Sequence, residues 1–296
     1  EGVGPVLARG KAKIFRLRKE RSRRFKEWGK LSISAEYTPL TFSPVDFPQV
    51  SIIIPAHNAY AYTFHCLQSI IEYTSSGYYE VIVVNDASSD PTQDMLDGIT
   101  GIRVIQNLEQ RGFIVSCNIG AKQARGTYLL FVNNDCQVSS GWLCSLISVL
   151  HRDPAVGMVG AKLLYPDGSL QEAGGIVWRD GSAWNYGRGD DPHKPEYNYL
   201  RPVDYCSGAC LAVRRDLFEC LGGFDLEYAP AYGEDMDLAF KIRASGSKVL
   251  YQPATEVVHF EGVSTGKSLF TGIKSHQILK DRKSTRLNSS HYRTSR

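Results

Sequence analysis

The stretch that most limits how this chain can fold is residues 128–135, YLLFVNND. Its apolar part, 128–132, predicts a strand that is buried on both faces of a sheet. The strand ends abruptly in Asn133, Asn134 and Asp135. A carboxylate at the carboxyl end of a buried strand lies where open α/β sheets bind their ligands. Asn-Asn-Asp alone also suits a simple turn, so the other strands must decide between the two interpretations.

The same pattern occurs twice earlier in the chain. We expect a strand over 50–54, stopped by Pro55-Ala56-His57-Asn58, and a second over 80–84, stopped by Asn85-Asp86. Helices separate the strands, which predicts an α/β fold with a mostly parallel sheet and helices on both faces. The polar ends of neighbouring strands would then form one cleft. The other elements expected here are a helix carrying Phe64, Leu67, Ile70 and Ile71 on one face, a helix starting at 88–91, a strand over 102–106 and a helix over 112–125.

The second half of the chain alternates less regularly. Residues 165–203 are rich in Gly, Asp, Pro and aromatic residues, which predicts hairpins and loops of the kind that often bind ligands. We expect a strand over 203–213 with a bulge at Ser207-Gly208. The other expected elements are a helix over 140–151 capped by a serine, a strand over 156–164, helices over 214–220 and 234–244, and strands over 248–251 and 256–260.

The charge is distributed unevenly along the chain. Residues 1–30 carry 11 Lys or Arg against 3 Asp or Glu, and residues 281–296 carry 5 against 1, whereas the whole chain has a net charge of only +3. The remaining residues therefore have a net charge of −9. This profile argues against nucleic-acid binding, which needs basic residues across the binding face. An acidic enzyme that handles an anionic substrate usually needs a metal ion between the two.

The two ends of the chain are interpreted separately from the core. Residues 1–48 comprise a basic, helix-prone segment and a proline-containing linker; the segment is either a solvated helix or a peripheral contact with an anionic membrane or a partner. Residues 281–296 resemble translated vector sequence, so we expect a non-native tail. The chain starts at Glu1, which fits a fragment. We find no membrane span or signal peptide, and expect the 7 cysteines to be reduced and mostly buried.

Several side chains suit the chemistry of a site. Asp86 can accept hydrogen bonds from a nucleobase or ribose, and Asp135 can bind a divalent cation. Glu234, Asp235 and Asp237 open a helix, where its dipole favours them, but three carboxylates in four residues also suit a polar substrate, with one acting as a base. His259 follows an apolar strand and can supply a neutral imidazole to a metal. No GxGxxG follows a strand, and 262–268 is one residue short of a P-loop.

Taken together, these segments resemble the family-2 glycosyltransferases with the GT-A fold, especially bacterial rhamnosyltransferase-like members. The resemblance covers about residues 49–266. It rests on the order of VSIIIPAHN (50–58), VIVVNDASSD (81–90), RGFIVSCNIGAKQARGTYLLFVNND (111–135), GGFDLEY (222–228), YGEDMDLAFKIRASG (232–246) and VVHFEGVSTG (257–266).

The resemblance implies a glycosyltransferase domain over 49–280, with a nucleotide-binding half (49–135) and an acceptor-binding half (136–280) that contains a smaller mixed subregion. It implies Asp135 and His259 as ligands of Mg²⁺ or Mn²⁺, Asp235 as the catalytic base and Glu234 as the residue that orients the acceptor. The residues implied near the nucleotide-sugar are Pro55, His57, Asn58, Asp86, Arg111, Gly112, Asn118 and Asn134. Two positions depart from the family pattern: His57 stands where an aromatic residue is common, and the metal-binding DxD motif opens with Asn133.

The implied reaction is an inverting transfer of a sugar from a dTDP-, UDP- or GDP-sugar to a glycan or lipid-linked saccharide. We expect a cytoplasmic enzyme of bacterial polysaccharide or cell-wall synthesis, acting at the inner face of the membrane. A sugar nucleotidyltransferase is an alternative, but its Gly-rich basic loop is replaced by PAHNAYAYTFHC after the first strand. A non-catalytic carbohydrate-binding relative is a third hypothesis, although such a relative is expected to lack the acidic pair or the metal carboxylate, which this chain retains.

Overall fold

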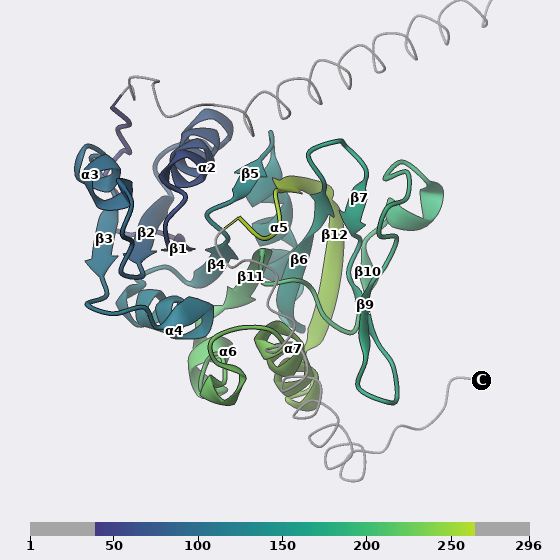
Figure 1. Ribbon diagram of the computed structural model, residues 1–296. Helices are drawn as coiled ribbons and strands as arrows, with labels where there is room; N and C mark the ends of the chain where they lie inside the picture. Colours follow the sequence, from purple (N-terminus) through teal and green to yellow (C-terminus); the bar gives the residue numbers. More distant parts are fainter. Residues whose placement is uncertain (1–38, 264–296) are drawn as a thin grey trace, which may run out of the picture.

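The computed structural model describes residues 39–263, which form a mixed ten-stranded sheet covered by helices (Figure 1). Its first half is parallel, in the strand order β4-β1-β2-β3. Because the chain runs from β1 outward to β3 and then returns to place β4 on the other side of β1, the topological switch point lies between β1 and β4. The strands are β1 (Val50–Ala56), β2 (Tyr79–Asn85), β3 (Arg103–Gln106) and β4 (Tyr128–Val132), and the connecting helices are α2 (Tyr60–Tyr73), α3 (Thr92–Asp97) and α4 (Gly112–Gln123).

The second half of the sheet is mixed. The strand β11 (Cys210–Arg214) lies antiparallel between β4 and β6 (Val156–Leu164), and β12 (Lys248–His259) runs parallel to β6. Short strands extend this half: β5 (Cys136–Val138), β7 (Leu170–Glu172) and β10 (Arg201–Pro202). The expected α/β sheet, mostly parallel with a smaller mixed part, is therefore confirmed.

Helices cover both faces of the sheet, as expected, because strand residues alternate between two cores. In β1, Ile52 and Ile54 belong to a core with α2, α3 and α5 (Trp142–Arg152). Ile53 belongs to the opposite core with α4, α6 (Arg215–Cys220) and α7 (Glu234–Ala244). All seven residues of β1 are buried, and each large apolar side chain buried in this way contributes about 1.5–3 kcal/mol.

Two strand predictions are wrong in a way that matters for the site. The strand expected over 203–213 is only β11, Cys210–Arg214, because Ser207 and Gly208 form a turn whose amides bond to carboxylates instead of to a neighbouring strand. The two strands expected over 248–251 and 256–260 are the single strand β12, whose register against β6 shifts between Gln252 and Glu256.

Two smaller predictions also fail. Pro55 lies inside β1 instead of ending it, which is possible because the pairing with β4 stops at Ile53 and only β2 continues alongside. The helix α5 has Gly141 as its N-cap, with no side-chain cap, in place of the expected serine. The remaining helix and strand predictions agree with the structure to within a few residues. Of the 7 cysteines, all unpaired, only Cys144 and Cys220 are exposed.

The expected loop region 165–203 contains the hairpin of β8 (Gly175–Val177) and β9 (Ala183–Asn185) and the short 3₁₀ helix η1 (Pro195–Tyr197). A second 3₁₀ helix, η2 (Leu226–Tyr228), precedes α7. Within residues 39–263, no helix combines the length and apolar character needed to cross a membrane. The predictions for the basic segment before residue 39 and for the tail after residue 280 lie outside the described residues.

Candidate active site

The ends of β1 and β2 form a cradle that the chain holds in shape by its own hydrogen bonds. His57 Nδ1 contacts the carbonyl oxygen of Asp86 at 2.7 Å. Asn58 Oδ1 accepts a hydrogen bond from the amide of Ser89 at 2.8 Å, and the amide of Asn58 donates to Ser88 Oγ at 2.8 Å. Three non-glycine residues in this cradle have positive φ: Asn58, Ala59 and Ala87. Such backbone strain persists where the surrounding contacts over-determine it, and it clusters at functional sites.

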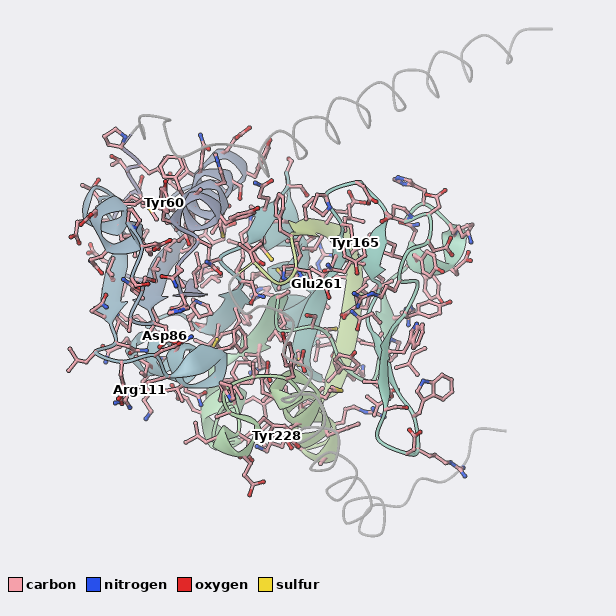
Figure 2. The ribbon with its side chains drawn as sticks, viewed as in Figure 1. Tyr60, Asp86, Arg111, Tyr165, Tyr228 and Glu261 are labelled. Atoms are coloured by element: carbon pink, nitrogen blue, oxygen red, sulfur yellow. The ribbon has the colours of Figure 1, made fainter. Side chains whose placement is uncertain are left out.

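The carboxylate of Asp86 binds the start of α4. Its Oδ1 accepts from Arg111 N–H at 2.9 Å and Asn107 Nδ2 at 2.7 Å, and its Oδ2 accepts from Gly112 N–H at 2.7 Å. A negative charge is favourable at a helix N-terminus, and Figure 2 shows Asp86 and Arg111 close together at this junction. A carboxylate has about four acceptor positions, so roughly one remains for a ligand. The φ of Gly112 is +83°, and a Cβ there would lie 2.7 Å from Pro230.

The other residues predicted near the nucleotide differ in what they contact. Pro55 is buried within β1. The guanidinium of Arg111 is half exposed and pairs with Glu109 at 3.1 Å. Asn118 uses both ends of its amide on the main chain of Phe224, donating at 2.8 Å and accepting at 3.0 Å. Asn118 therefore ties α4 to the turn before η2, and its predicted contact with the nucleotide-sugar stays a prediction.

A second group of polar side chains lies at the carboxyl end of β4. Asp135 Oδ1 is 3.2 Å from His259 Nε2, and both residues are buried. Asn133 Nδ2 also contacts His259 Nε2, at 3.3 Å, while Asn133 Oδ1 is buried without a hydrogen-bond partner among residues 39–263. The adjacent Asn134 donates to Thr63 Oγ1 of α2 at 3.0 Å. The structure thus brings together the two predicted metal ligands, which are 124 positions apart in the chain.

One further residue sets the state of this histidine. Gln171 Oε1 lies 2.8 Å from His259 Nδ1. Because a side-chain amide oxygen only accepts, Nδ1 carries a proton there and a neutral imidazole turns the lone pair of Nε2 toward Asp135. A hydrogen bond to the far ring nitrogen is the usual support of a metal-binding histidine. Sequence reasoning missed Gln171, which lies in a short strand of the aromatic-rich region.

These residues fit a hard divalent cation. A neutral Nε2 and a carboxylate oxygen are both acceptors, and facing each other at 3.2 Å they are favourable only with a cation or a proton between them. Burial acts to raise the pKa of Asp135. When a proton on His259 takes the place of the cation, the positive charge and the hydrogen bond of the imidazolium outweigh burial and hold the pKa of Asp135 below its usual range. The nearby Cys136 is unsuited as a ligand, because burial raises the pKa of its thiol well above the ordinary value.

The acidic pair at the start of α7 has two different surroundings. Glu234 is 5% exposed, its Oε2 has no hydrogen-bond partner in the described part of the chain, and burial together with the charge of Asp235 raises its pKa to about 8. Asp235 is partly exposed, and it accepts from Gly208 N–H at 3.0 Å and from its neighbour Met236 N–H at 2.8 Å. Burial also raises the pKa of Asp235. A carboxylate with a raised pKa and access to solvent suits general base chemistry.

Sequence reasoning also missed a third carboxyl at this place. Glu172, the last residue of β7, is 1% exposed, and burial raises its pKa to about 8 although the amide of Ser207 lowers it. The charge of Asp235 raises the pKa of Glu172 further, so the two groups are close enough to interact. The only signal in the sequence was its place in the long loop region.

The family of this chain is identified by its match to a family model. The family model described as "Glycosyl transferase family 2" matches residues 51–222, more than half of the chain. The chain belongs to this family. Its expected membership and fold are therefore confirmed. The matched region includes Asp86 and Asp135 but ends before the acidic pair and His259.

Two curated relatives of this family-2 chain are much longer proteins. The chain is 34% identical over 228 residues to the "O-antigen biosynthesis protein RfbC" of Myxococcus xanthus, which covers 73% of the chain and 18% of that protein. It is 29% identical over 287 residues to an uncharacterized protein of Sinorhizobium fredii, covering 89% of the chain and 31% of that protein. The chain thus spans less than a third of either relative.

Solved structures show the same fold. The family-2 glycosyltransferase chain is similar to GalNAc-T7, solved with UDP, GalNAc and Mn²⁺, with a TM-score of 0.64 at 18% identity over 80% of this chain and 48% of that one. It is also similar to the mannosyltransferase PcManGT of Pyrobaculum calidifontis, solved with GDP-Man and Mn²⁺, with a TM-score of 0.56 at 20% identity over 93% of this chain and 74% of that one.

Proposed function

We propose that the chain is a metal-dependent, inverting glycosyltransferase that moves a sugar from a nucleotide-diphosphate sugar to a hydroxyl group of a saccharide. The observation that carries the proposal is the buried pair of Asp135 Oδ1 and His259 Nε2, 3.2 Å apart at the carboxyl end of the central strands. Family membership supplies the reaction class. The structural relatives solved with UDP, with GDP-Man and with Mn²⁺ support the donor class and the metal.

The donor would bind at the ends of β1, β2 and β4. In this proposal, Pro55, His57, Asn58 and Asp86 surround the base and ribose, because they lie at the ends of β1 and β2, and β1 borders the switch point. Arg111 supplies a half-exposed guanidinium for the diphosphate. The residues predicted as the nucleotide-binding half, 49–135, contain all of these groups, whereas 136–280 would hold the acceptor.

Asp135 and His259 would hold Mg²⁺ or Mn²⁺, with Gln171 orienting the imidazole and the unpartnered Asn133 Oδ1 as an additional oxygen. Such a cation neutralises the charge that develops on a diphosphate leaving group. The contribution of the chain is to keep Asp135 ionised and to present Nε2 as a lone pair.

The proton chemistry would fall to Asp235. Its carboxylate is fixed by the amides of Gly208 and Met236 yet keeps contact with solvent. In the proposed step, the acceptor oxygen forms a bond to the anomeric carbon as its proton passes to Asp235, and the bond to the nucleotide diphosphate breaks. Attack opposite the leaving group inverts the configuration, so no protein nucleophile is needed. Glu234 would orient the acceptor indirectly, since it is almost fully buried.

A role in bacterial cell-surface polysaccharide synthesis is the proposal for the acceptor. It rests on the relative described as an O-antigen biosynthesis protein. A glycan or lipid-linked saccharide at the cytoplasmic face of the membrane would suit the basic segment 1–30.

The experiment that tests this function is a donor screen. The chain is incubated with UDP-, GDP- and dTDP-sugars, Mn²⁺ or Mg²⁺ and a panel of saccharide acceptors, and nucleoside diphosphate and glycosylated product are measured by mass spectrometry. We expect one donor to give product whose anomeric configuration is inverted. Product containing a new nucleotide–sugar bond would instead identify a nucleotidyltransferase. Tight saccharide binding without turnover of any donor would identify a non-catalytic relative.

A further inference from the structure

A buried carboxyl that the proposed mechanism does not use lies beside the acidic pair. Glu172 Oε1 accepts a hydrogen bond from Ser207 N–H at 2.9 Å. Its Oε2 is buried and has no hydrogen-bond partner within residues 39–263. A buried polar atom without a partner lowers stability by about 1–3 kcal/mol. Other residues of the same length, such as methionine, would fill the same volume without that loss of stability. Packing alone therefore does not account for a carboxyl at position 172.

Two consecutive backbone amides hold the carboxyls of Glu172 and Asp235. The amide of Ser207 donates to Glu172, and the next amide in the chain, that of Gly208, donates to Asp235 Oδ2 at 3.0 Å. A single peptide unit therefore separates the groups that hold the two carboxyls. Successive backbone amides of this kind form a concave turn whose N–H groups bind acceptor oxygens.

The turn between the two carboxyls has little freedom to move. Ser207 Oγ accepts from Ala209 N–H at 3.2 Å, and the carbonyl oxygen of Ser207 accepts from Cys210 N–H at 3.4 Å, where β11 begins. A Cβ on Gly208 would lie 3.2 Å from the ring of Phe113, so α4 closes the other side. The direction of the Gly208 amide is therefore set by how Ser207 is held.

The charges of the two carboxyls are also compatible with this arrangement. Burial raises the pKa of Glu172 to about 8, and the charge of Asp235 contributes to the rise. Burial therefore favours the protonated form of Glu172 near neutral pH. A neutral carboxyl still accepts the hydrogen bond of Ser207, and it does so without placing a second negative charge beside the base.

We propose that Glu172 is a positioning residue for the catalytic base: by holding Ser207, it fixes the Gly208 amide that orients the carboxylate of Asp235. This inference rests on the proposed role of Asp235. It predicts that Glu172 acts on the rate of transfer and not on donor binding, because its contacts lie on the acceptor side and do not include Asp86, Asp135 or His259.

The test compares two substitutions of similar size. Glu172→Gln keeps a carbonyl oxygen that accepts from Ser207, whereas Glu172→Met fills the same volume and cannot accept. We expect Glu172→Met to lower kcat by roughly 10–10²-fold, as small misplacements of reacting groups do, with the Kd of the donor unchanged. Glu172→Gln should stay within about 3-fold of the wild-type kcat, since it restores the geometry. Glu219→Gln, an exposed carboxyl on α6, is the matched control.

A double-mutant cycle shows whether Glu172 acts through Asp235. If it does, adding Glu172→Met to Asp235→Asn should lower the residual turnover by less than about 3-fold, because the group being positioned is already gone. A full additional loss of 10-fold or more would overturn the inference while leaving the base assignment intact. If Asp235→Asn itself retains near-wild-type turnover, the base assignment fails as well, so the two failures are distinguishable. Should Glu172→Met not fold, by circular dichroism, Glu172→Ala serves in the same cycle.

Discussion

The two sides of the site differ in how their polar groups are satisfied. On the side where we propose that the nucleotide binds, Asp86 and Asn58 bond to the main chain and side chains around them, and Asp86 alone accepts three hydrogen bonds from the chain. On the proposed acceptor side, Glu172 and Glu234 are almost fully buried and each keeps one oxygen without a partner in the described region. The first arrangement builds a rigid cradle. The second places two carboxyls with raised pKa values beside Asp235, the proposed base.

The metal pair joins the two sides. Asp135 follows β4, a strand of the nucleotide side, whereas His259 ends β12 and Gln171 lies in β7, both on the acceptor side. Backbone pairing between β5 and β12 places His259 opposite Cys136, the residue after Asp135. Figure 2 places Glu261 beside Tyr165, and these side chains form a hydrogen bond of 2.9 Å just beyond His259. The cation would therefore connect the cradle to the proton-transfer side.

The largest expected effect is the loss of transfer activity when the metal is removed. We expect EDTA to abolish transfer and Mn²⁺ or Mg²⁺ to restore it, and we expect Asp135→Ala to remove nearly all activity, because it deletes the charged ligand. The measurements are turnover and Mn²⁺ binding by calorimetry, with circular dichroism to confirm folding. Full activity of metal-free protein would contradict the metal role and leave the two sides unconnected.

The next expected effect falls on stability. Asp86→Ala removes three hydrogen bonds and leaves the buried side-chain amide of Asn107 and the partly buried backbone amides at the start of α4 unpaired, so the free energy of unfolding should fall by about 2–5 kcal/mol. Denaturant unfolding measures it, with the exposed Asp94→Ala in α3 as control. If Asp86→Ala kept full stability and lost only donor binding, Asp86 would serve to bind the ligand. The claim that its hydrogen bonds hold the cradle rigid would then be wrong.

A smaller effect should appear in the pH dependence of stability. Burial, with the charge of Asp235, raises the pKa of Glu234 from 4.5 to about 8 in the fold. Between these values the folded protein holds a proton that the unfolded chain releases, so this group lowers the free energy of unfolding as pH rises from about 4.5 to 8. Glu234→Gln removes this dependence. We expect its melting temperature, relative to wild type, to increase by several degrees from pH 5 to pH 9, at roughly 2–4 °C for each kcal/mol. If the difference in melting temperature between Glu234→Gln and wild type did not change with pH, the pKa of Glu234 would not be raised in the fold.

Much of the fold follows from local patterns in the sequence. The apolar strands 50–54, 80–84 and 128–132 end in polar residues, and the structure places them side by side as β1, β2 and β4. Helix α7 and strand β6 also occur at the expected residues. The strand predicted through Ser207 fails because the amides of the turn bond to Glu172 and Asp235, which are distant in sequence.

The site is predictable to the extent that each residue carries its own chemical signal. The chemistry of Asp135 and of His259 indicates a metal ligand at each position, the family resemblance pairs them, and the two side chains are in contact. Gln171 and Glu172 could not, because their importance comes from contacts with His259 and Ser207 that only the folded chain creates. Asn118 was predicted near the nucleotide-sugar, and sequence reasoning did not anticipate that its amide also bonds to the main chain of Phe224.

The central claim is that donor binding and proton removal depend on different residues. The most direct test is to measure donor affinity and turnover in Asp235→Asn. The substitution keeps the size of the side chain and removes its basicity. We expect turnover to fall by roughly 10²–10⁴-fold, the usual contribution of a general base, while the Kd of the donor with Mn²⁺, by calorimetry, stays within about 2-fold of wild type, a difference under about 0.5 kcal/mol. Loss of donor binding as large as in Asp135→Ala, or near-wild-type turnover beside an inactive Glu234→Gln, would contradict the account.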